Sequence, residues 1–333
     1  MTNAQLNRLR RLLCELQDHI RHILLGARRR TGGQWSRVAG STAADTIYAV
    51  DRISEGAILE WFERHWPRAW PVELVMEGIE EGEVVTIPRG VPASRTRFKC
   101  ILDPIDGTRG LMYDKRSAWI LAGVADQRGA RTNVRDIIVA AMTELPTSRH
   151  ACADQFSAVR GGGVVATTCE LQTGRKTRRR TLPSTAKDFR HGFVSFARFF
   201  TAGKTMISQI EEAVWADLHG PADVQLPLVF DDQYISTGGQ LAELLVGHDR
   251  MVADVRPLVF AKLGIRAGLV CHPYDICTEL ILREAGGIVE APTGGPVRVP
   301  LDTTTPVAWV GYANSTLARL ARPAMRQALK RFL

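Results

Sequence analysis

The chain has 333 residues, 45% of them hydrophobic and 23% charged, and a formal charge of +8. A length above the roughly 250 to 300 residues at which a single core stops growing predicts two subdomains, and the positive charge favours anionic partners. No apolar stretch approaches the roughly 20 residues of a membrane span, and charges interrupt the N-terminal leucines, so a membrane-embedded protein and a signal peptide are excluded and a cytoplasmic location is expected.

The first half of the chain predicts two helices followed by strands. Leucines and isoleucines at three- and four-residue steps predict an amphipathic helix from about residue 6 to Gly26. A short extended piece at 46–50 and a helix capped by Asp51 or Ser54 follow. Short apolar segments bounded by turn residues predict strands, at 71–78, 98–103, 117–125 and 135–144.

A glycine-turned hairpin is expected at 156–171, and the charged, aperiodic segment 171–187 is expected to be an exposed linker. Its basic run RKTRRR, at 175–180, has no interleaved aromatic residues, so it is interpreted as a solvated loop and nucleic-acid binding is not expected. A basic rim that attracts polyanionic substrate is the second interpretation of this run. The six cysteines form no CxxC pair and are expected to be reduced and mostly buried.

The second half alternates helices and strands. Helices are predicted at 203–218, 236–248, 275–287 and 317–332, the last kinked or divided at Pro323, and strands at 249–255, 287–292 and 306–314. This order favours an α/β layer packed against the earlier α+β portion. We therefore expect an N-terminal α+β domain over 1–185 and a C-terminal α/β domain over 186–333.

The stretch CILDPIDGTRGL brings Asp103 and Asp106 close together at the end of an apolar run. Two buried carboxylates a few residues apart repel each other, so they must share either a proton or cations. Magnesium prefers oxygen ligands and suits a few carboxylates together with a substrate phosphate. Gly107 allows close approach of the backbone to a ligand, and Thr108 offers a hydroxyl and an N–H group. For the two acids alone, an ordinary turn after a strand remains the alternative.

DPIDGT resembles the signature of the inositol monophosphatase-like family, the magnesium-dependent, lithium-sensitive phosphatases related to fructose-1,6-bisphosphatase. The resemblance extends over about residues 8–314, through three further segments. They are ADTIYAVDRISE with Asp45, Asp51 and Glu55, LVMEG with Glu77, and HPYDICTELILREAGG with Asp275. It implies a layered αβαβα sandwich of the inositol monophosphatase and fructose-1,6-bisphosphatase type.

The resemblance also implies two magnesium ions per site, with a third as an open option. The implied metal ligands are Glu77, Asp103, the carbonyl of Ile105, Asp106 and Asp275. Thr108, oriented by Asp45, would act with Glu77 to position and deprotonate the attacking water. The implied substrate-binding residues are Asp106, Gly107, Thr108, Arg109 and Asp275. Glu80, Glu81 and Glu83 remain alternatives to Glu77.

Several residues depart from the family pattern. Gly78 occupies the place where many relatives carry a second glutamate, and this puts the third metal in question. Tyr274 stands where a tryptophan is usual, and Gly268 lies where inositol-specific members have an acidic residue, so inositol specificity is not implied. His272 is interpreted as a hydrogen-bonded core residue, with substrate contact as the alternative.

The sequence therefore predicts a magnesium-dependent phosphomonoesterase that acts on a small anionic phosphate ester, either a sugar or inositol phosphate or a 3'-phosphonucleotide. A haloacid-dehalogenase-type phosphatase is disfavoured, because its two acids are two residues apart and these are three apart. A catalytically silent anion-binding or scaffold protein is the alternative from another class. A homodimer is an open option, and no membrane partner is expected.

Overall fold

A computed structural model describes residues 1–31, 38–41, 46–79, 83–223, 228–266 and 269–333. The helices are α1 (Asn3–Thr31), α2 (Ala49–His65), α3 (Thr108–Met112), α4 (Lys204–Asp223), α5 (Thr237–Val246), α6 (Arg256–Leu263), α7 (Pro273–Ile276), α8 (Glu279–Glu284) and α9 (Ser315–Phe332). The strands of the first half are β1 (Val38–Ser41), β2 (Thr46–Tyr48), β3 (Val72–Met76), β4 (Val85–Ile87), β5 (Phe98–Asp106), β6 (Ala118–Asp126), β7 (Ile137–Leu145), β8 (Cys152–Val159), β9 (Val164–Glu170) and β10 (Lys176–Arg179). Those of the second half are β11 (Gly192–Phe196), β12 (Val229–Phe230), β13 (Asp249–Asp254), β14 (Ile288–Glu290) and β15 (Trp309–Tyr312).

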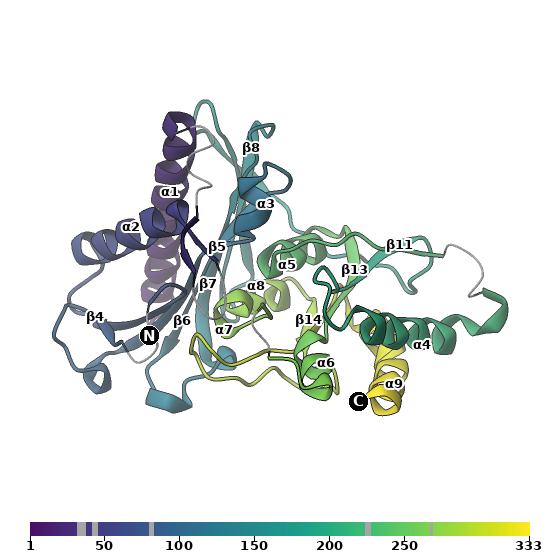
Figure 1. Cartoon of the computed structure of the whole chain (residues 1–333). Coiled ribbons are helices and arrows are strands. Elements are labelled where there is room, and N and C mark those ends of the chain that lie inside the picture. Colours follow the sequence, from purple (N-terminus) through teal and green to yellow (C-terminus); the bar gives the residue numbers. More distant parts are fainter. Residues whose placement is uncertain (32–37, 42–45, 80–82, 224–227, 267–268) are drawn as a thin grey trace.

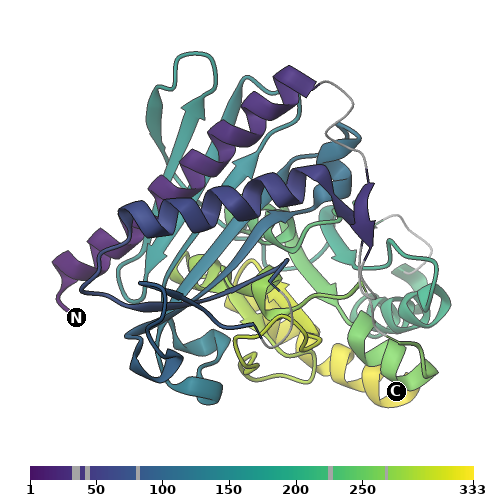
Figure 2. The ribbon, with the colours of Figure 1, turned by 60° about the vertical axis from the view of Figure 1, so that its left-hand side comes forward.

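The elements form five layers: helices, a sheet, helices, a second sheet and helices (Figure 1). The larger sheet has the strand order β10-β9-β8-β7-β6-β5-β3-β4, and the smaller one has the order β12-β11-β13-β15-β14. Helices α1 and α2 cross the outer face of the larger sheet (Figure 2). Helices α5, α7 and α8 lie between the two sheets, and α4 and α9 pack together beyond the smaller one. The predicted layered sandwich is confirmed.

The central strands β5, β6 and β7 of the larger sheet are buried on both faces, and this explains why they are nearly continuous apolar runs. On β5, Leu102 faces α1 and α2, whereas Ile101 faces the layer that contains α5 and α8. The core on the inner side continues into the smaller sheet, so side chains from both halves of the chain share it. Among the described residues, no helix is both long enough and apolar enough to cross a membrane.

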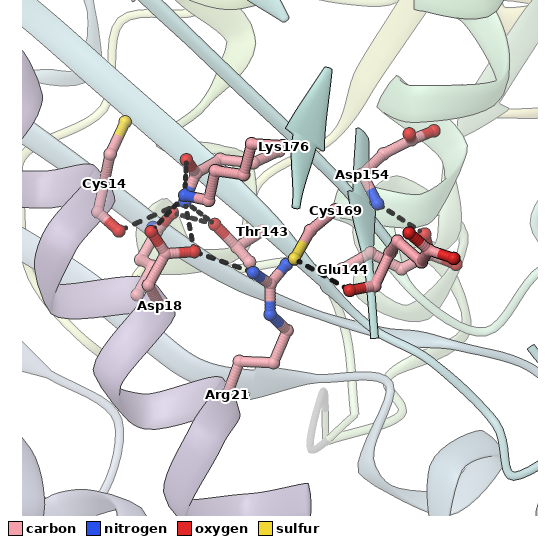
Figure 3. Close-up of polar contacts among 11 residues, drawn as sticks. Cys14, Asp18, Arg21, Thr143, Glu144, Asp154, Cys169 and Lys176 are labelled. Atoms are coloured by element: carbon pink, nitrogen blue, oxygen red, sulfur yellow. Dashed lines mark hydrogen bonds and ion pairs between the residues drawn. The ribbon is translucent and has the colours of Figure 1, made fainter. Parts of the chain in front are cut away.

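A polar layer fixes α1 against the larger sheet (Figure 3). The buried Gln17 amide donates to the carbonyl of Ala141 at 2.8 Å, and its oxygen accepts from the Thr143 hydroxyl at 2.8 Å. Asp18 forms ion pairs with Arg21 on its own helix and with Lys176 on β10. Because a buried polar group must be paired, these contacts determine the position of α1 along the sheet.

All the strands predicted in the first half of the chain are present, but the ends of its helices differ from prediction. Helix α1 does not end at Gly26 and continues to Thr31. Helix α2 begins at Ala49, so Asp51 and Ser54 lie inside it and do not cap it. A single helical glycine costs only about 1 kcal/mol, and packing on the sheet outweighs that cost.

Two other predictions need correction. The segment expected to be an exposed linker contains β10, whose Arg179 pairs with Asp154 on β8. Helix α9 is a single element with Pro323 inside it, so the option of a helix divided at Pro323 is wrong and the option of a kink stays a prediction. Ala321, Met325 and Leu329 are buried along α9, and this packing holds the helix together across the proline.

Candidate metal centre

Three carboxylates that are far apart in the sequence meet at the boundary between the two halves of the chain. Asp103 and Asp106 lie at the end of β5, and Asp275 lies on α7. Each offers an oxygen within 4.8 Å of those offered by the other two. We call these three residues the acid cluster. The sequence prediction therefore placed these three side chains together correctly.

The beginning of α5 holds Asp106 in place. Its carboxylate accepts hydrogen bonds from the Ser236 hydroxyl at 2.8 Å, from the Thr237 N–H at 3.3 Å and from the Gly238 N–H. A Cβ at Gly238 would lie 2.5 Å from Leu121 and 3.0 Å from the Asp106 carboxylate, so a larger residue does not fit at this position. An element from the second half of the chain therefore orients an acid from the first half.

A left-handed glycine turns the chain away from the acid cluster after Asp106. Gly107 has φ of 95°, and a Cβ there would lie 3.0 Å from Ser236. Only glycine adopts this conformation without strain and leaves room for α5. The adjacent Thr108 donates its hydroxyl to the carbonyl of Ile105 at 2.8 Å, so two residues of the predicted site are directly bonded to each other.

Local backbone bonds orient the other two acids. Asp103 accepts from the Ile105 N–H at 2.9 Å, and Asp275 accepts from the His272 N–H at 2.6 Å at the beginning of α7. His272 is buried, stacks on Tyr274 and contacts the Tyr274 hydroxyl at 3.2 Å. This agrees with the interpretation of His272 as a core residue, and it gives Tyr274 a packing role beside Asp275.

Burial raises the free energy of the acid cluster when all three carboxylates are ionised. Desolvation, followed by the charges of Glu77, Asp106 and Asp275, raises the pKa of Asp103 well above its usual value. Desolvation raises the pKa of Asp106 to about 6, although its hydrogen bonds and the Arg256 guanidinium act in the opposite direction. The pKa of Asp275 is likewise raised well above normal, first by desolvation and then by Asp106. An all-oxygen, buried and electrostatically strained donor set fits a hard divalent cation such as magnesium.

Glu77 lies beside the acid cluster, in the turn after β3. Strand β3 runs parallel to β5 with Met76 opposite Leu102, so Glu77 emerges next to Asp103. Its charge raises the pKa of both Asp103 and Asp275, which places it within electrostatic reach of them. Glu81 lies outside the described residues, as does Glu80, so these alternatives to Glu77 are not placed.

Gly78 leaves a space that a carboxylate from α2 occupies. Its φ is +91°, and a Cβ on this residue would lie 2.1 Å from a carboxylate oxygen of Glu55. Glu55 therefore occupies the space that the side chain of any other residue at position 78 would enter. The sequence grouped Glu55 with Asp45 and Asp51 but did not connect it with position 78.

Of the other predicted site residues, Arg109 lies on α3 next to Thr108 and is partly buried, and Asp45 lies outside the described residues. The hydrogen bonds that Ser236, Thr237 and Gly238 donate to Asp106 were not predicted from the sequence. A signal was available, because STGG before an apolar helix pairs an N-cap residue with small residues that allow close approach. The sequence did not indicate Arg256 either. Arg256 is buried and pairs with Asp254 at 2.6 Å, and its guanidinium acts on the acid cluster as a fixed positive charge.

Comparison with known proteins adds evidence on the fold. No protein-family model matches the chain, and no curated protein matches it by sequence. Among solved structures, the fructose-1,6-bisphosphatase of Leishmania major in holo form has a TM-score of 0.68 and 16% identity, with 96% of this chain and 94% of that chain covered.

Two further solved structures are similar over nearly their whole length. The extragenic suppressor protein suhB of Bartonella henselae has a TM-score of 0.65 and 16% identity, with 98% of this chain and 100% of that chain covered. An inositol monophosphatase of Anabaena (Nostoc) has a TM-score of 0.58 and 16% identity, with 100% and 98% covered. The chain therefore has the fold shared by inositol monophosphatase and fructose-1,6-bisphosphatase.

Proposed function

We propose that this protein is a magnesium-dependent phosphomonoesterase of the inositol monophosphatase-like family, acting on a small anionic phosphate ester. The observation that carries the proposal is the convergence of Asp103, Asp106 and Asp275 within 4.8 Å of one another, with the first two buried and Asp275 partly buried. The fold supports the proposal, since two of the similar structures are named as phosphatases. A scaffold would gain nothing from carboxylates whose mutual repulsion destabilises it.

In this proposal the acid cluster and Glu77 hold two magnesium ions, with the Ile105 carbonyl as a neutral ligand. When bound, the metal supplies a water of lowered pKa and neutralises charge on the phosphate. The chain's own residues do the rest. Asp106 is held rigid by α5, so it offers its oxygens in one geometry. The N–H groups of Gly107 and Thr108 bind phosphate oxygens, and Arg109 adds a fixed positive charge beside them.

Thr108 and Glu77 would position the attacking water and accept its proton, with Asp45 orienting Thr108 as the resemblance implies. The Thr108 hydroxyl donates to the Ile105 carbonyl, so a bond from Thr108 to Asp45 requires its proton to leave that carbonyl, whereas the hydroxyl oxygen can accept from water in either orientation. Lithium sensitivity, a homodimer and the option of a third metal belong to the same proposal and rest on the sequence resemblance, whereas a cytoplasmic location rests on the composition of the chain.

The test is a phosphate-release screen with and without magnesium. The esters are an inositol phosphate, fructose 1,6-bisphosphate, histidinol phosphate and 3'-phosphoadenosine 5'-phosphate. We expect magnesium-dependent release from at least one ester, reduced by about 100-fold or more in Asp103→Asn, since removal of one electrostatic stabiliser costs about that much. Asp126→Asn, an exposed acid at the end of β6, is the matched control and should retain activity. No release from any ester, with or without metal, would favour the scaffold reading.

A further inference from the structure

A second charged site lies at the opposite end of the larger sheet. Four arginines come together there from four separate segments, and we call them the arginine cluster. They are Arg135 before β7, Arg160 after β8, Arg283 on α8 and Arg298 before β15. Each of the other three lowers the pKa of Arg135, after desolvation, so all three act electrostatically on Arg135.

Backbone hydrogen bonds hold these four segments together. The N–H of Val134 donates to the carbonyl of Val299 at 3.0 Å, next to both Arg135 and Arg298. The N–H of Arg160 donates to the carbonyl of Ile138 at 2.9 Å. Glu284 on α8 accepts from the N–H groups of the turn after β8, at 2.8 and 3.0 Å. The arginines are therefore brought together by the fold and do not meet by chance on flexible loops.

One buried carboxylate lies beneath the arginine cluster. Glu279 is 1% exposed, and one of its oxygens lies 2.8 Å from Arg283 and 3.6 Å from Arg135. Its other oxygen is buried and has no hydrogen-bond partner among the described residues. Arg160 donates to the backbone carbonyls of residues 135 and 137.

Positive charge is in excess at this place. Four arginines face two carboxylates, Glu279 and Glu284, which leaves a surplus of two positive charges. Arg128 and Asp136 lie nearby and form a neutral pair at 2.9 Å. Arg160 and Arg298 are exposed, whereas the side chains of Arg135 and Arg283 are 28% and 21% exposed. Between them, the described residues offer several guanidinium N–H groups that no carboxylate occupies.

We propose that the arginine cluster is a binding site for a small phosphorylated anion, separate from the acid cluster. Guanidinium groups bind phosphoryl oxygens through paired hydrogen bonds, and a phosphoryl dianion matches the surplus of two charges. Along the larger sheet, the site lies well away from Asp103. Asp103 on β5 lies opposite Leu121 on β6, and Leu121 lies opposite Met142 on β7. Met142 is five residues beyond the start of β7, and this length of strand corresponds to about 17 Å at about 3.3 Å per residue.

The arginine cluster is also connected to the metal centre. Helix α8 begins at Glu279, only four residues after Asp275, and α7 and α8 are nearly continuous. An anion that draws Arg135 or Arg283 away from Glu279 changes the pairing of the residue that begins α8. The site is therefore suited to an effector that acts on the metal centre from outside it.

The test is calorimetric titration of the full-length protein with inorganic pyrophosphate in EDTA, so that no metal at the acid cluster can bind the probe. We expect one equivalent to bind, and Arg160→Gln and Arg298→Gln each to weaken binding at least about tenfold, since charge-assisted bonds of this kind account for that much. Both substitutions are at exposed positions, and unchanged melting temperatures show that the variants fold. Arg64→Gln on α2, whose side chain is 69% exposed, is the matched control and should bind as the unmodified protein does.

Three results would overturn the proposal. The first is no binding at millimolar pyrophosphate. The second is equal weakening in Arg64→Gln, which would mean attraction to overall charge alone. The third is a changed affinity in Asp103→Asn with normal affinity in Arg160→Gln and Arg298→Gln, which would place the anion at the acid cluster. None of these results depends on phosphatase activity.

Discussion

Replacing Asp103 by asparagine should stabilise the protein when no metal is bound. Asparagine has nearly the same shape and can still accept from the Ile105 N–H, so the change removes mainly the charge. Two unit charges 4.8 Å apart repel by about 3.5 kcal/mol at an effective dielectric constant of about 20. The charges of Glu77, Asp106 and Asp275 raise the pKa of Asp103, after desolvation, in agreement with this repulsion. Because the new amide must itself be desolvated, we expect a gain of about 1 to 3 kcal/mol.

The assay is thermal unfolding in EDTA at pH 8, where this gain raises the melting temperature by about 2 °C for each kcal/mol. Burial raises the pKa of Asp103 in the folded state, so the folded protein binds more protons than the unfolded chain, and its stability falls as pH rises. The advantage of Asp103→Asn should therefore be largest at pH 8 and shrink towards pH 4.5. Magnesium should reverse the order, because it stabilises the unmodified protein more.

Asp126→Asn is the control, since this acid lies at the exposed end of β6 and its loss should leave the melting temperature within about 1 °C. If Asp103→Asn lowered the melting temperature in EDTA as much as a core substitution does, the acids would not repel one another in the folded state. The idea of a cage that needs a cation would then be wrong.

Three other perturbations test the surroundings of the acid cluster. In urea unfolding, Gly78→Ala should destabilise the protein by more than the roughly 1 kcal/mol expected for Gly90→Ala. Both glycines have positive φ, but only Gly78 has Glu55 against it. Equal losses of stability in the two variants would mean that the Glu55 contact is irrelevant. Ser236→Ala removes both the hydrogen bond to Asp106 and the N-cap of α5. It should therefore lower the free energy of unfolding by about 1 to 2 kcal/mol and weaken magnesium binding in calorimetry. Unchanged magnesium affinity would contradict the role of Ser236 in orienting Asp106. Magnesium should raise the melting temperature more at pH 8 than at pH 5, because protons compete with it for Asp106, and a rise independent of pH would argue against binding there.

Strands buried on both faces were the easiest part of the fold to predict. FKCILD and SAWILAGVA are apolar at nearly every position because both faces of the larger sheet are covered at these strands. Short edge elements were harder to predict. Strand β10 is formed by KTRR, which has no apolar pattern, and its register depends on Lys176 meeting Asp18 and Arg179 meeting Asp154. Contacts of that kind exist only in three dimensions, so no local pattern announces them.

The site was predictable where its chemistry is local and not where it is assembled. Asp103, Asp106, Gly107 and Thr108 are neighbours in the chain, and their spacing alone suggested a cation. The support for Asp106 comes from Ser236, 130 residues away, and no spacing rule connects the two. Asp275 was found only through resemblance, since an acid in the first turn of a helix is ordinarily a cap, and its carboxylate does accept the His272 N–H.

Gly78 shows how a departure in sequence can be compensated by the fold. Read along the chain, a glycine after Glu77 removes a carboxylate from the turn after β3. In space, the absence of a side chain at 78 admits Glu55, whose oxygen lies where the Cβ of any other residue would be. A carboxylate from α2 therefore lies against position 78, and its place depends on the packing of that helix. A substitution that shifts α2 should therefore move the Glu55 carboxylate without changing β3 or β5. A carboxylate on residue 78 itself would not respond to a shift of α2 in this way.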